Sequence, residues 1–357
     1  MISKDNFTKE WILEVKGSER SDQAIIERQI YALHLLEEFT KEFTNFIFKG
    51  GTALSLISNE FPRFSIDIDI LVDIKHKTFF TLDNLNKVLN HSEFTRVVEN
   101  IRQPKHNIDK QHFEFYYDGV FGSNVYVLLD VVYAESHYHE IVDLEIKNRL
   151  LKQVGKPLKV KVPSIHDLLA DKLCAYAPNT IGKKLGDGRD IEVIKQMFDV
   201  AYLFDHYPLN PTFHNIYKSI AKEEILSREL SATFKETVLD TIKTSLNIIL
   251  EGKLDSIQYT ALKSAIRRFV SFVRDNSFNV ESAKICAIKN IFASLLVLTE
   301  GYKEFEVILL NQDFFLPEYK VFKSTKKWLR LTNPEQYRIF DNCLKVMTFL
   351  KIKITNP

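Results

Sequence analysis

Residues 48–73 read FKGGTALSLISNEFPRFSIDIDILVD, and the order of residue types in this stretch predicts the arrangement of the surrounding elements. A short apolar run at 46–48 predicts a strand that ends in a Gly-Gly pair, and 52–58 is typical of a helix. The run 65–72 alternates polar and apolar residues, as a strand with one buried face does. The predicted order is therefore strand, glycine turn, helix, strand.

Two carboxylates, Asp67 and Asp69, are two positions apart in the second of these strands. Strand side chains alternate between faces, so both acids are expected on one face, with Ile66, Ile68 and Ile70 facing a core. Two like charges a few ångströms apart repel each other unless a cation lies between them. Oxygen ligands suit Mg²⁺, which also keeps waters and substrate phosphates, and Mn²⁺ is the other candidate. We therefore predict that Asp67 and Asp69 bind a divalent metal.

A third carboxylate is predicted to join this metal site. Asp130 interrupts the apolar run 125–133, VYVLLDVVY, which is typical of a buried strand. An acid in such surroundings needs a partner or a metal ion. If the two strands are neighbours, three carboxylates could hold two ions. A hydrogen-bonded acid at a strand end is the alternative for Asp130.

The glycine pair is a candidate phosphate-binding turn. Gly50 and Gly51 permit a tight bend and let a phosphate approach the backbone N–H groups at the start of the following helix. Thr52 is expected to cap that helix. A Gly-Gly-Thr sequence or a DxD sequence is common by itself, whereas the two in this order within 26 residues are a much more specific signal.

Beyond this stretch the sequence predicts an α+β protein with an all-helical C-terminal part. Residues 22–45 have the apolar spacing of an amphipathic helix, and 112–117 and 125–133 are typical of strands. From Ser164 onward the pattern is helical almost throughout. We predict one domain at 1–205 and a second at 206–357, with the change from mixed to helical structure somewhere between 161 and 211.

Composition is that of an ordinary globular protein, with 45% hydrophobic and 27% charged residues. The three cysteines are too few and too far apart for a disulfide framework, and the N-terminal residues lack the apolar core of a signal peptide, so we expect a cytoplasmic protein with no membrane association. Residues 201–357 carry 22 Lys and Arg against 17 Asp and Glu, and residues 1–200 carry 26 against 30. This asymmetry favours a polyanionic partner on the C-terminal side.

The stretch 48–73 resembles the AbiEii/AbiGii family of toxins, whose pattern is KGGTaL followed by RfSxDiDi. Residues 171–182, DKLCAYAPNTIG, and 194–204, IKQMFDVAYLF, resemble the family's later motifs. The resemblance covers roughly residues 22–205 and implies a polymerase-β-like nucleotidyltransferase core, a small mixed sheet with helices. It also implies a toxin of a toxin–antitoxin pair, associated with phage defence by abortive infection, and some relatives modify the acceptor end of tRNA.

The resemblance further implies a role for each matching residue. Asp67 and Asp69 would bind metal, Thr52 and Ser65 would contact phosphate beside Gly50 and Gly51, Lys172 would neutralise the triphosphate, and Asp199 would complete the site. The substrate would be an NTP, the acceptor tRNA, another RNA or a protein, and the partner a cognate antitoxin. Asp130 follows only the general nucleotidyltransferase pattern. Many members of the wider superfamily have Gly-Ser where this chain has Gly51-Thr52.

Structural alternatives remain open for several of these residues. Asp199 lies among apolar residues and could simply hold Lys172 or Arg189, and Ser65 could cap a turn. A basic run at 320–330 with Phe322 and Trp328 could bind RNA, although such runs are usually solvent faces. The rival functions are a non-catalytic nucleotide-binding scaffold on the same fold and a DxD glycosyltransferase, which would not explain the glycine turn before the DxD.

Overall fold

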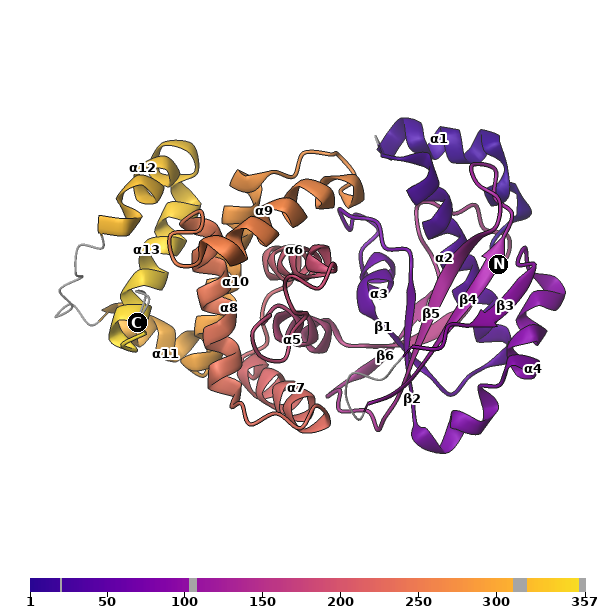
Figure 1. Ribbon diagram of the computed structural model, residues 1–357, viewed down its shortest axis with the longest axis horizontal. Helices are drawn as coiled ribbons and strands as arrows, with labels where there is room; N and C mark the ends of the chain where they lie inside the picture. Colours follow the sequence, from indigo (N-terminus) through magenta and orange to yellow (C-terminus); the bar gives the residue numbers. More distant parts are fainter. Residues whose placement is uncertain (20, 103–107, 311–319, 353–357) are drawn as a thin grey trace. The chain divides into compact units, whose positions relative to one another are not determined.

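The computed structural model describes residues 1–19, 21–102, 108–310 and 320–352 (Figure 1). They form two compact units. The first consists of Met1–Ser164 and Ser271–Ser277, and the second of Ile165–Val270 and Phe278–Pro357. The division after Ser164 comes before the predicted boundary at residue 205.

The chain divides into its two units at Ser164 because of how two helices pack. Helices α5 (Ile165–Ala175) and α6 (Asp190–His206) pack against each other and against helices that follow them in the chain. The predicted 1–205 domain therefore combines the first unit with two helices of the second.

The first unit is built on a five-stranded mixed sheet in the order β1-β2-β5-β4-β3. Its strands are β1 Ile47–Lys49, β2 Ile68–Val72, β3 Arg96–Glu99, β4 Asp109–Tyr117 and β5 Val125–Tyr133. β2 and β5 run parallel, and the other neighbouring pairs are antiparallel. A separate two-stranded sheet is formed by β6 Ile141–Glu145 and β7 Lys159–Pro163.

The helices of the first unit precede the sheet or connect its strands. They are α1 Lys9–Glu19, α2 Gln23–Glu42, α3 Gly50–Ile57 and α4 Leu82–Leu85, with short 3-10 helices at Lys4–Phe7, Ile74–Phe79 and Asn86–His91. The predicted helix at 22–45 and the strands at 46–48, 112–117 and 125–133 are present, whereas the strand predicted at 65–72 begins only at Ile68, so Ser65 and Asp67 precede it. β3, β6 and β7 were not predicted, although β7 reads KVKVP and alternates polar and apolar residues as a strand with one buried face does.

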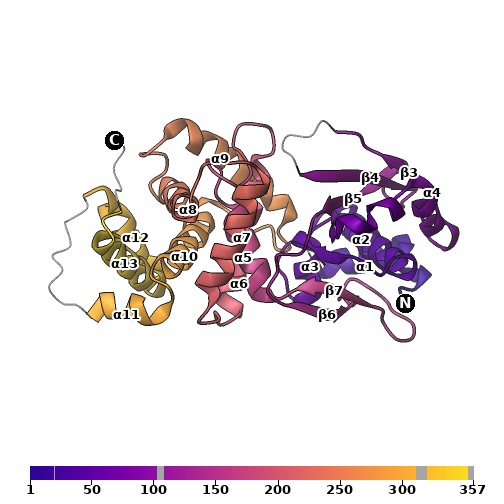
Figure 2. The ribbon, with the colours of Figure 1, turned by 90° about the horizontal axis from the view of Figure 1, so that it is seen from below.

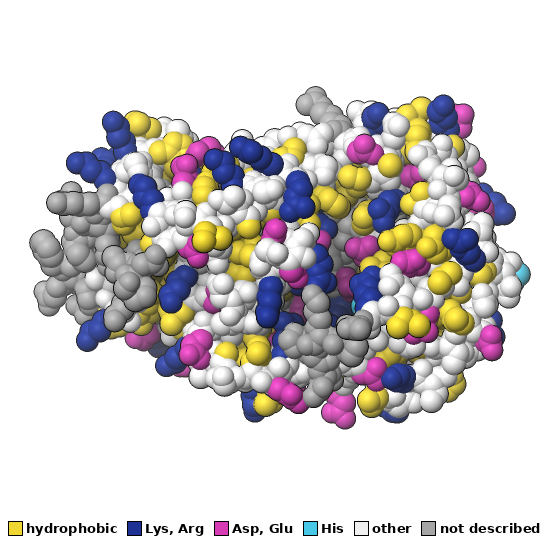
Figure 3. Space-filling model, in the orientation of Figure 1, with side chains coloured by type: hydrophobic (Ala, Val, Ile, Leu, Met, Phe, Trp, Pro, Cys, Tyr) yellow, Lys and Arg dark blue, Asp and Glu magenta, His cyan; other side chains and the backbone are white. Residues whose placement is uncertain are grey.

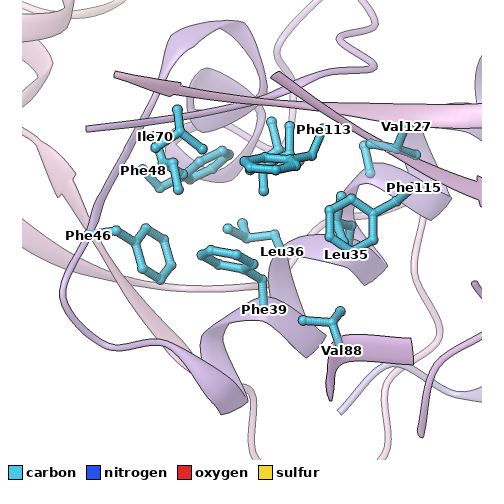
Figure 4. Packing of buried hydrophobic residues seen from close by; sticks show 14 of the residues in the cluster. Leu35, Leu36, Phe39, Phe46, Phe48, Ile70, Val88, Phe113, Phe115 and Val127 are labelled. Atoms are coloured by element: carbon cyan, nitrogen blue, oxygen red, sulfur yellow. The ribbon is translucent and has the colours of Figure 1, made fainter. Parts of the chain in front are cut away.

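One face of the sheet and helix α2 enclose an aromatic core (Figures 2 and 4). Phe39 of α2 packs among Phe46 and Phe48 at β1, and Phe113 and Phe115 of β4 lie over the same helix. All five side chains are at most 5% exposed. Burial of large apolar side chains contributes about 1.5–3 kcal/mol each. Because strand residues alternate, this packing turns the intervening polar residues to the opposite face.

All regular secondary structure in the described part of the second unit is helical, as predicted. Its helices after α6 are α7 Phe213–Ser227, α8 Phe234–Ile249, α9 Ser256–Phe269, α10 Val280–Leu298, α11 Tyr302–Leu310, α12 Lys323–Thr332 and α13 Pro334–Phe349. Local capping fixes several starts: Thr233 and Glu236 form a capping box at α8, and Asp255 accepts from the backbone of Gln258 at α9. Helix α10 packs against α6, α8 and α13.

Within the described residues, no single helix is long and apolar enough to cross a membrane. Helices α10 and α11 pass that test only as a pair, and they are bent by 98° at the break between them.

Candidate active site

Two of the three predicted carboxylates lie on neighbouring strands of the first unit, and the third, Asp67, immediately precedes β2. Asp69 of β2 is the register partner of Asp130 on the parallel strand β5, so the two Cα atoms lie side by side across the strand pair. Ile68, Ile70 and Val131 are fully buried toward α2. Alternation therefore places Asp69 and Asp130 together on the face away from α2. The two strands are therefore neighbours, which was the condition for Asp130 to join the predicted metal site.

The glycine bend lies directly against Asp69. Lys49, the last residue of β1, pairs with Asp69 in the antiparallel register, and Gly50 follows it with φ +80°. A methyl group on Gly50 would lie 2.1 Å from Asp69 Oδ2. Gly50 is thus required both for its left-handed backbone and for the space that the carboxylate occupies.

Helix α3 begins at Gly50, so the prediction that Thr52 caps it is wrong. Lys49 stands at the cap position and makes no side-chain capping bond. The Thr52 side chain is fully buried, and its hydroxyl donates to the backbone carbonyl of Asp67 at 2.6 Å. The contact ties the helix to the residue just before β2, which gives Thr52 a positioning role. Its phosphate contact stays a prediction.

The second glycine packs against the turn before β2. A methyl group on Gly51 would lie 2.6 Å from Ser65 Oγ and 2.7 Å from a guanidinium nitrogen of Arg63. Arg63 is 2% exposed and donates to the carbonyl of Phe64. The Ser65 hydroxyl therefore lies beside the glycine bend, which is the position that its predicted phosphate role requires.

A segment from far along the chain holds this turn. Phe64 N donates to Phe272 O at 2.8 Å, and Arg274 N donates to Pro62 O at 3.0 Å. The guanidinium of Arg274 donates to Glu19 at 2.6 Å, and both side chains are buried. Residues 271–277 thus belong structurally to the first unit. Sequence reasoning missed this contact, because no local pattern joins residues some 200 positions apart.

Gln29 of α2 also supports the turn and was not predicted. It is fully buried, and its Oε1 accepts from Ser65 N at 3.1 Å. The same helix that packs under the sheet therefore fixes the backbone of Ser65. The sequence offered a faint signal, since Gln29 is a polar residue between the apolar Ile26 and Ile30 of that helix.

His112 is the second residue that the sequence reasoning missed. It is the register partner of Asp130 on β4, and its Nδ1 lies 2.6 Å from Asp130 Oδ1. The side chains of His112 and Asp130 are 16% and 28% exposed. Asp69, Asp130 and His112 form a row across three neighbouring strands.

The other two predicted site residues lie in the second unit and contact each other. Lys172 of α5 forms an ion pair with Asp199 of α6 at 3.2 Å, and the side chains are 6% and 0% exposed. A buried ammonium in a helical core needs such a counter-charge. Asp199 thus holds Lys172, which was the structural alternative for this residue. The predicted participation of both in catalysis stays a prediction.

The basic run at 320–330 does not supply the predicted aromatic contact from Phe322. Phe322 is fully buried and packs edge-on against Phe340. Lys326 is paired with Asp341 at 2.5 Å. The Lys320 side chain lies outside the described residues. On the face seen in Figure 3, Lys and Arg side chains lie among acidic and apolar ones.

A second group of ligand-type atoms lies on α2 and has other partners. One ligand atom each from His34, Glu37 and Glu38 lies within 4.8 Å of the others. Burial lowers the pKa of His34 to about 3, so the imidazole is neutral at pH 7, and its Nε2 accepts from Glu93 N at 3.3 Å. Both oxygens of Glu37 accept from Ile2 N. These contacts give the group a structural role.

The comparison with protein families identifies this chain as a nucleotidyltransferase. The model of the nucleotidyl transferase AbiEii toxin of type IV toxin–antitoxin systems matches residues 34–280, which is more than half of the chain. The chain belongs to this family. Membership implies an NTP substrate and an antitoxin partner.

Two solved structures resemble the chain distantly. One is MenT4, a nucleotidyltransferase toxin from Mycobacterium tuberculosis, with 10% identity, a TM-score of 0.47, and coverage of 81% of this chain and 99% of that one. The other is an antigenic nucleotidyltransferase-like protein from Paracoccidioides brasiliensis, with 15% identity, a TM-score of 0.36, and coverage of 59% and 93%. A comparison with curated proteins gave no match.

Proposed function

We propose that this toxin binds an NTP together with Mg²⁺, for which Mn²⁺ can substitute, and transfers NMP to a hydroxyl group of tRNA, another RNA or a protein. The observation that carries the proposal is the packing of the Gly50 bend against Asp69, with Asp130 beside Asp69 in the register. A phosphate at the bend would then lie next to a pair of carboxylates, which is the surrounding that a metal–triphosphate complex needs.

The residues present fit a divalent ion. Asp69 and Asp130 offer hard oxygen ligands from one face, and Asp67 immediately precedes β2. Glycine at position 50 leaves free the space that any side chain would take from Asp69. Asp67, Asp69 and Asp130 would hold the ion, and once bound it would neutralise triphosphate charge and favour ionisation of the attacking hydroxyl.

The chain's own groups position the substrate. The backbone N–H groups of Gly50 and Gly51 open α3 and would donate to phosphate oxygens. The Ser65 hydroxyl beside Gly51 would add a donor, and Thr52 fixes the Asp67 carbonyl. Lys172 would supply a positive charge to the triphosphate, with Asp199 fixing its ammonium group. Transfer reactions of phosphoryl type gain most from positioning and charge neutralisation of this kind.

The proposed reaction is a substitution at the α-phosphorus. The acceptor hydroxyl oxygen forms a bond to this phosphorus as the bond to the oxygen that bridges to the β-phosphate breaks. Pyrophosphate leaves with that bridging oxygen and its electron pair, and the acceptor hydroxyl loses its proton. The product is an acceptor carrying NMP through a new phosphodiester linkage.

The biological setting is proposed from the family. The chain would act in the cytoplasm, without membrane association, as the toxin of an abortive-infection system against phage, and a cognate antitoxin would restrain it. The excess of basic residues after position 200 supports an RNA acceptor, because polyanions are drawn to net positive surfaces.

Labelled nucleotides test the proposal. The protein is incubated with each of the four NTPs, labelled at either the α- or the γ-phosphate, and with total tRNA, total RNA or cell protein. We expect transfer of the α-label only. Transfer of the label by the Asp67→Ala/Asp69→Ala variant should fall by at least about 10²-fold. Asp73→Ala, which alters a partly exposed acid just after β2, should leave the transfer unchanged.

Two outcomes would contradict the proposal. Equal labelling by the unmodified protein and by Asp67→Ala/Asp69→Ala removes these acids from the chemistry. Tight NTP binding with no transfer to any acceptor favours the non-catalytic scaffold.

A further inference from the structure

A row of three side chains crosses the sheet face that carries the proposed metal site. Asp69 on β2 is paired in register with Asp130 on β5, and Asp130 is paired with His112 on β4. Neighbouring strands are about 4.8 Å apart. His112 is therefore one strand away from Asp130 and two strands away from Asp69. Its side chain can reach Asp130 but not Asp69.

The contact between His112 and Asp130 has a defined polarity. The Nδ1 and Oδ1 atoms are 2.6 Å apart, and a carboxylate can only accept a hydrogen bond. The imidazole therefore carries its proton on Nδ1 and donates it to Oδ1. Within the described part of the chain, Oδ2 of Asp130 has no hydrogen-bonding partner. One oxygen of the carboxylate is thus fixed and the other remains for a ligand.

We infer that His112 is a positioning residue, which holds the Asp130 carboxylate so that its second oxygen can share a divalent cation with Asp69. This inference rests on the proposed function of the same site. Carboxylates that bind metals are commonly held by hydrogen bonds from outer groups, and loss of such a partner typically weakens metal binding by about 10–100-fold. A freely rotating Asp130 would have to lose side-chain freedom on each binding event.

The surroundings favour this role over simple packing. Phe113 and Phe115 on β4 point into the core, whereas His112 points to the opposite, polar face and is only partly buried. Glu114, the next residue of β4 on that polar face, accepts from Asn100 and Tyr116 instead. The hydrogen bond to Asp130 therefore distinguishes His112 from its neighbour on the same face.

Titration with Mn²⁺ tests the inference without any turnover. Free Mn²⁺ is followed by electron paramagnetic resonance in the full-length protein, with Mn²⁺ as the only added ligand. We expect His112→Ala to raise the Kd for Mn²⁺ by about 10–100-fold. His112→Asn, whose amide nitrogen can replace Nδ1, should remain within about threefold of the unmodified protein. Glu114→Gln is the matched control on the same strand and face and should leave the Kd unchanged.

A double variant separates this role from a general loss of structure. When Asp130→Asn is already present, adding His112→Ala should raise the Kd for Mn²⁺ no further, because His112 then has no carboxylate to position. Thermal unfolding of each variant checks that the folded fraction is the same.

An unchanged Kd in His112→Ala, or an equal rise in His112→Ala and His112→Asn, overturns the inference while the nucleotide transfer of the unmodified protein still stands. If the unmodified protein binds no Mn²⁺, the metal-holding part of the proposed function fails, and the inference fails with it.

Discussion

The same types of charged side chain are used in opposite ways in the two units. In the first unit, Asp69 and Asp130 lie side by side on a sheet face, and one oxygen of Asp130 is held by a partly exposed histidine. In the second unit, Lys172 and Asp199 form an ion pair within a helical core. The first arrangement concentrates like charge where a cation can bind, whereas the second cancels opposite charges where water is excluded. The ion pair satisfies its charges within the fold, whereas the neighbouring acids leave a negative charge that attracts a cation.

The largest expected effect is loss of stability when the buried pair is broken. Asp199→Asn leaves the Lys172 ammonium without its counter-charge, and we expect the free energy of unfolding to fall by about 3–5 kcal/mol. In the Lys172→Met/Asp199→Asn double variant most of that loss should be recovered, since no charge is then buried. Urea unfolding of the two variants measures both values.

Activity of the double variant sharpens the comparison. If Lys172 neutralises the triphosphate, transfer remains at least about 10²-fold below that of the unmodified protein although stability has returned. Full recovery of transfer would show that the pair serves the fold alone.

The next effect concerns the glycine bend. Gly50→Ala forces a left-handed conformation on alanine and places its methyl group on Asp69, so we expect transfer to fall by about 10²-fold. Gly155→Ala is the matched control, because Gly155 has φ +74° and open space around it. Backbone strain should lower the free energy of unfolding of both variants by about 1–2 kcal/mol. An equal loss of transfer in the two would contradict the proposed geometry.

A smaller effect is expected at the hydroxyl that ties α3 to β2. Thr52→Val keeps the shape of the side chain but removes the donor to the Asp67 carbonyl. The free energy of unfolding should fall by about 1–3 kcal/mol. Thr52→Ser retains the donor and should retain transfer. If Thr52→Val is as active as the unmodified protein, Thr52 does not position the carboxylate strand.

The smallest effect is stabilisation by the metal itself. A ligand at ten times its Kd raises the free energy of unfolding by about 1.4 kcal/mol. We expect Mg²⁺ with NTP to raise the unfolding temperature of the unmodified protein, and chelation by EDTA to reverse it. Asp69→Ala should show no metal-dependent rise. An equal rise in Asp69→Ala would place the metal elsewhere.

Local patterns predicted the parts of the site that are close in sequence. The alternation in SIDIDILV indicated a strand with one acidic face, and the glycine pair indicated the bend next to it. Both features depend on backbone geometry over a few residues, which the residue types largely decide. The cap predicted for Thr52 was wrong because the helix begins two residues earlier, at Gly50, and the Thr52 hydroxyl donates to the carbonyl of Asp67.

The partner of Asp130 could not be identified in this way. His112 and Asp130 pair only because Tyr117 and Val125 pair at the turn between their strands, and a seven-residue loop does not define that register. Likewise, nothing near Phe64 indicates that Phe272 returns to it.

The sequence by itself determined the order of strand, glycine bend, helix and carboxylate strand, and with it the class of chemistry, because each of these steps is specified by neighbouring residues. Only the tertiary structure decided that Asp130 stands beside Asp69, that His112 holds it, and that residues 271–277 secure the turn. These contacts join distant parts of the chain, and they form because apolar burial brings the strands and helices together in one register.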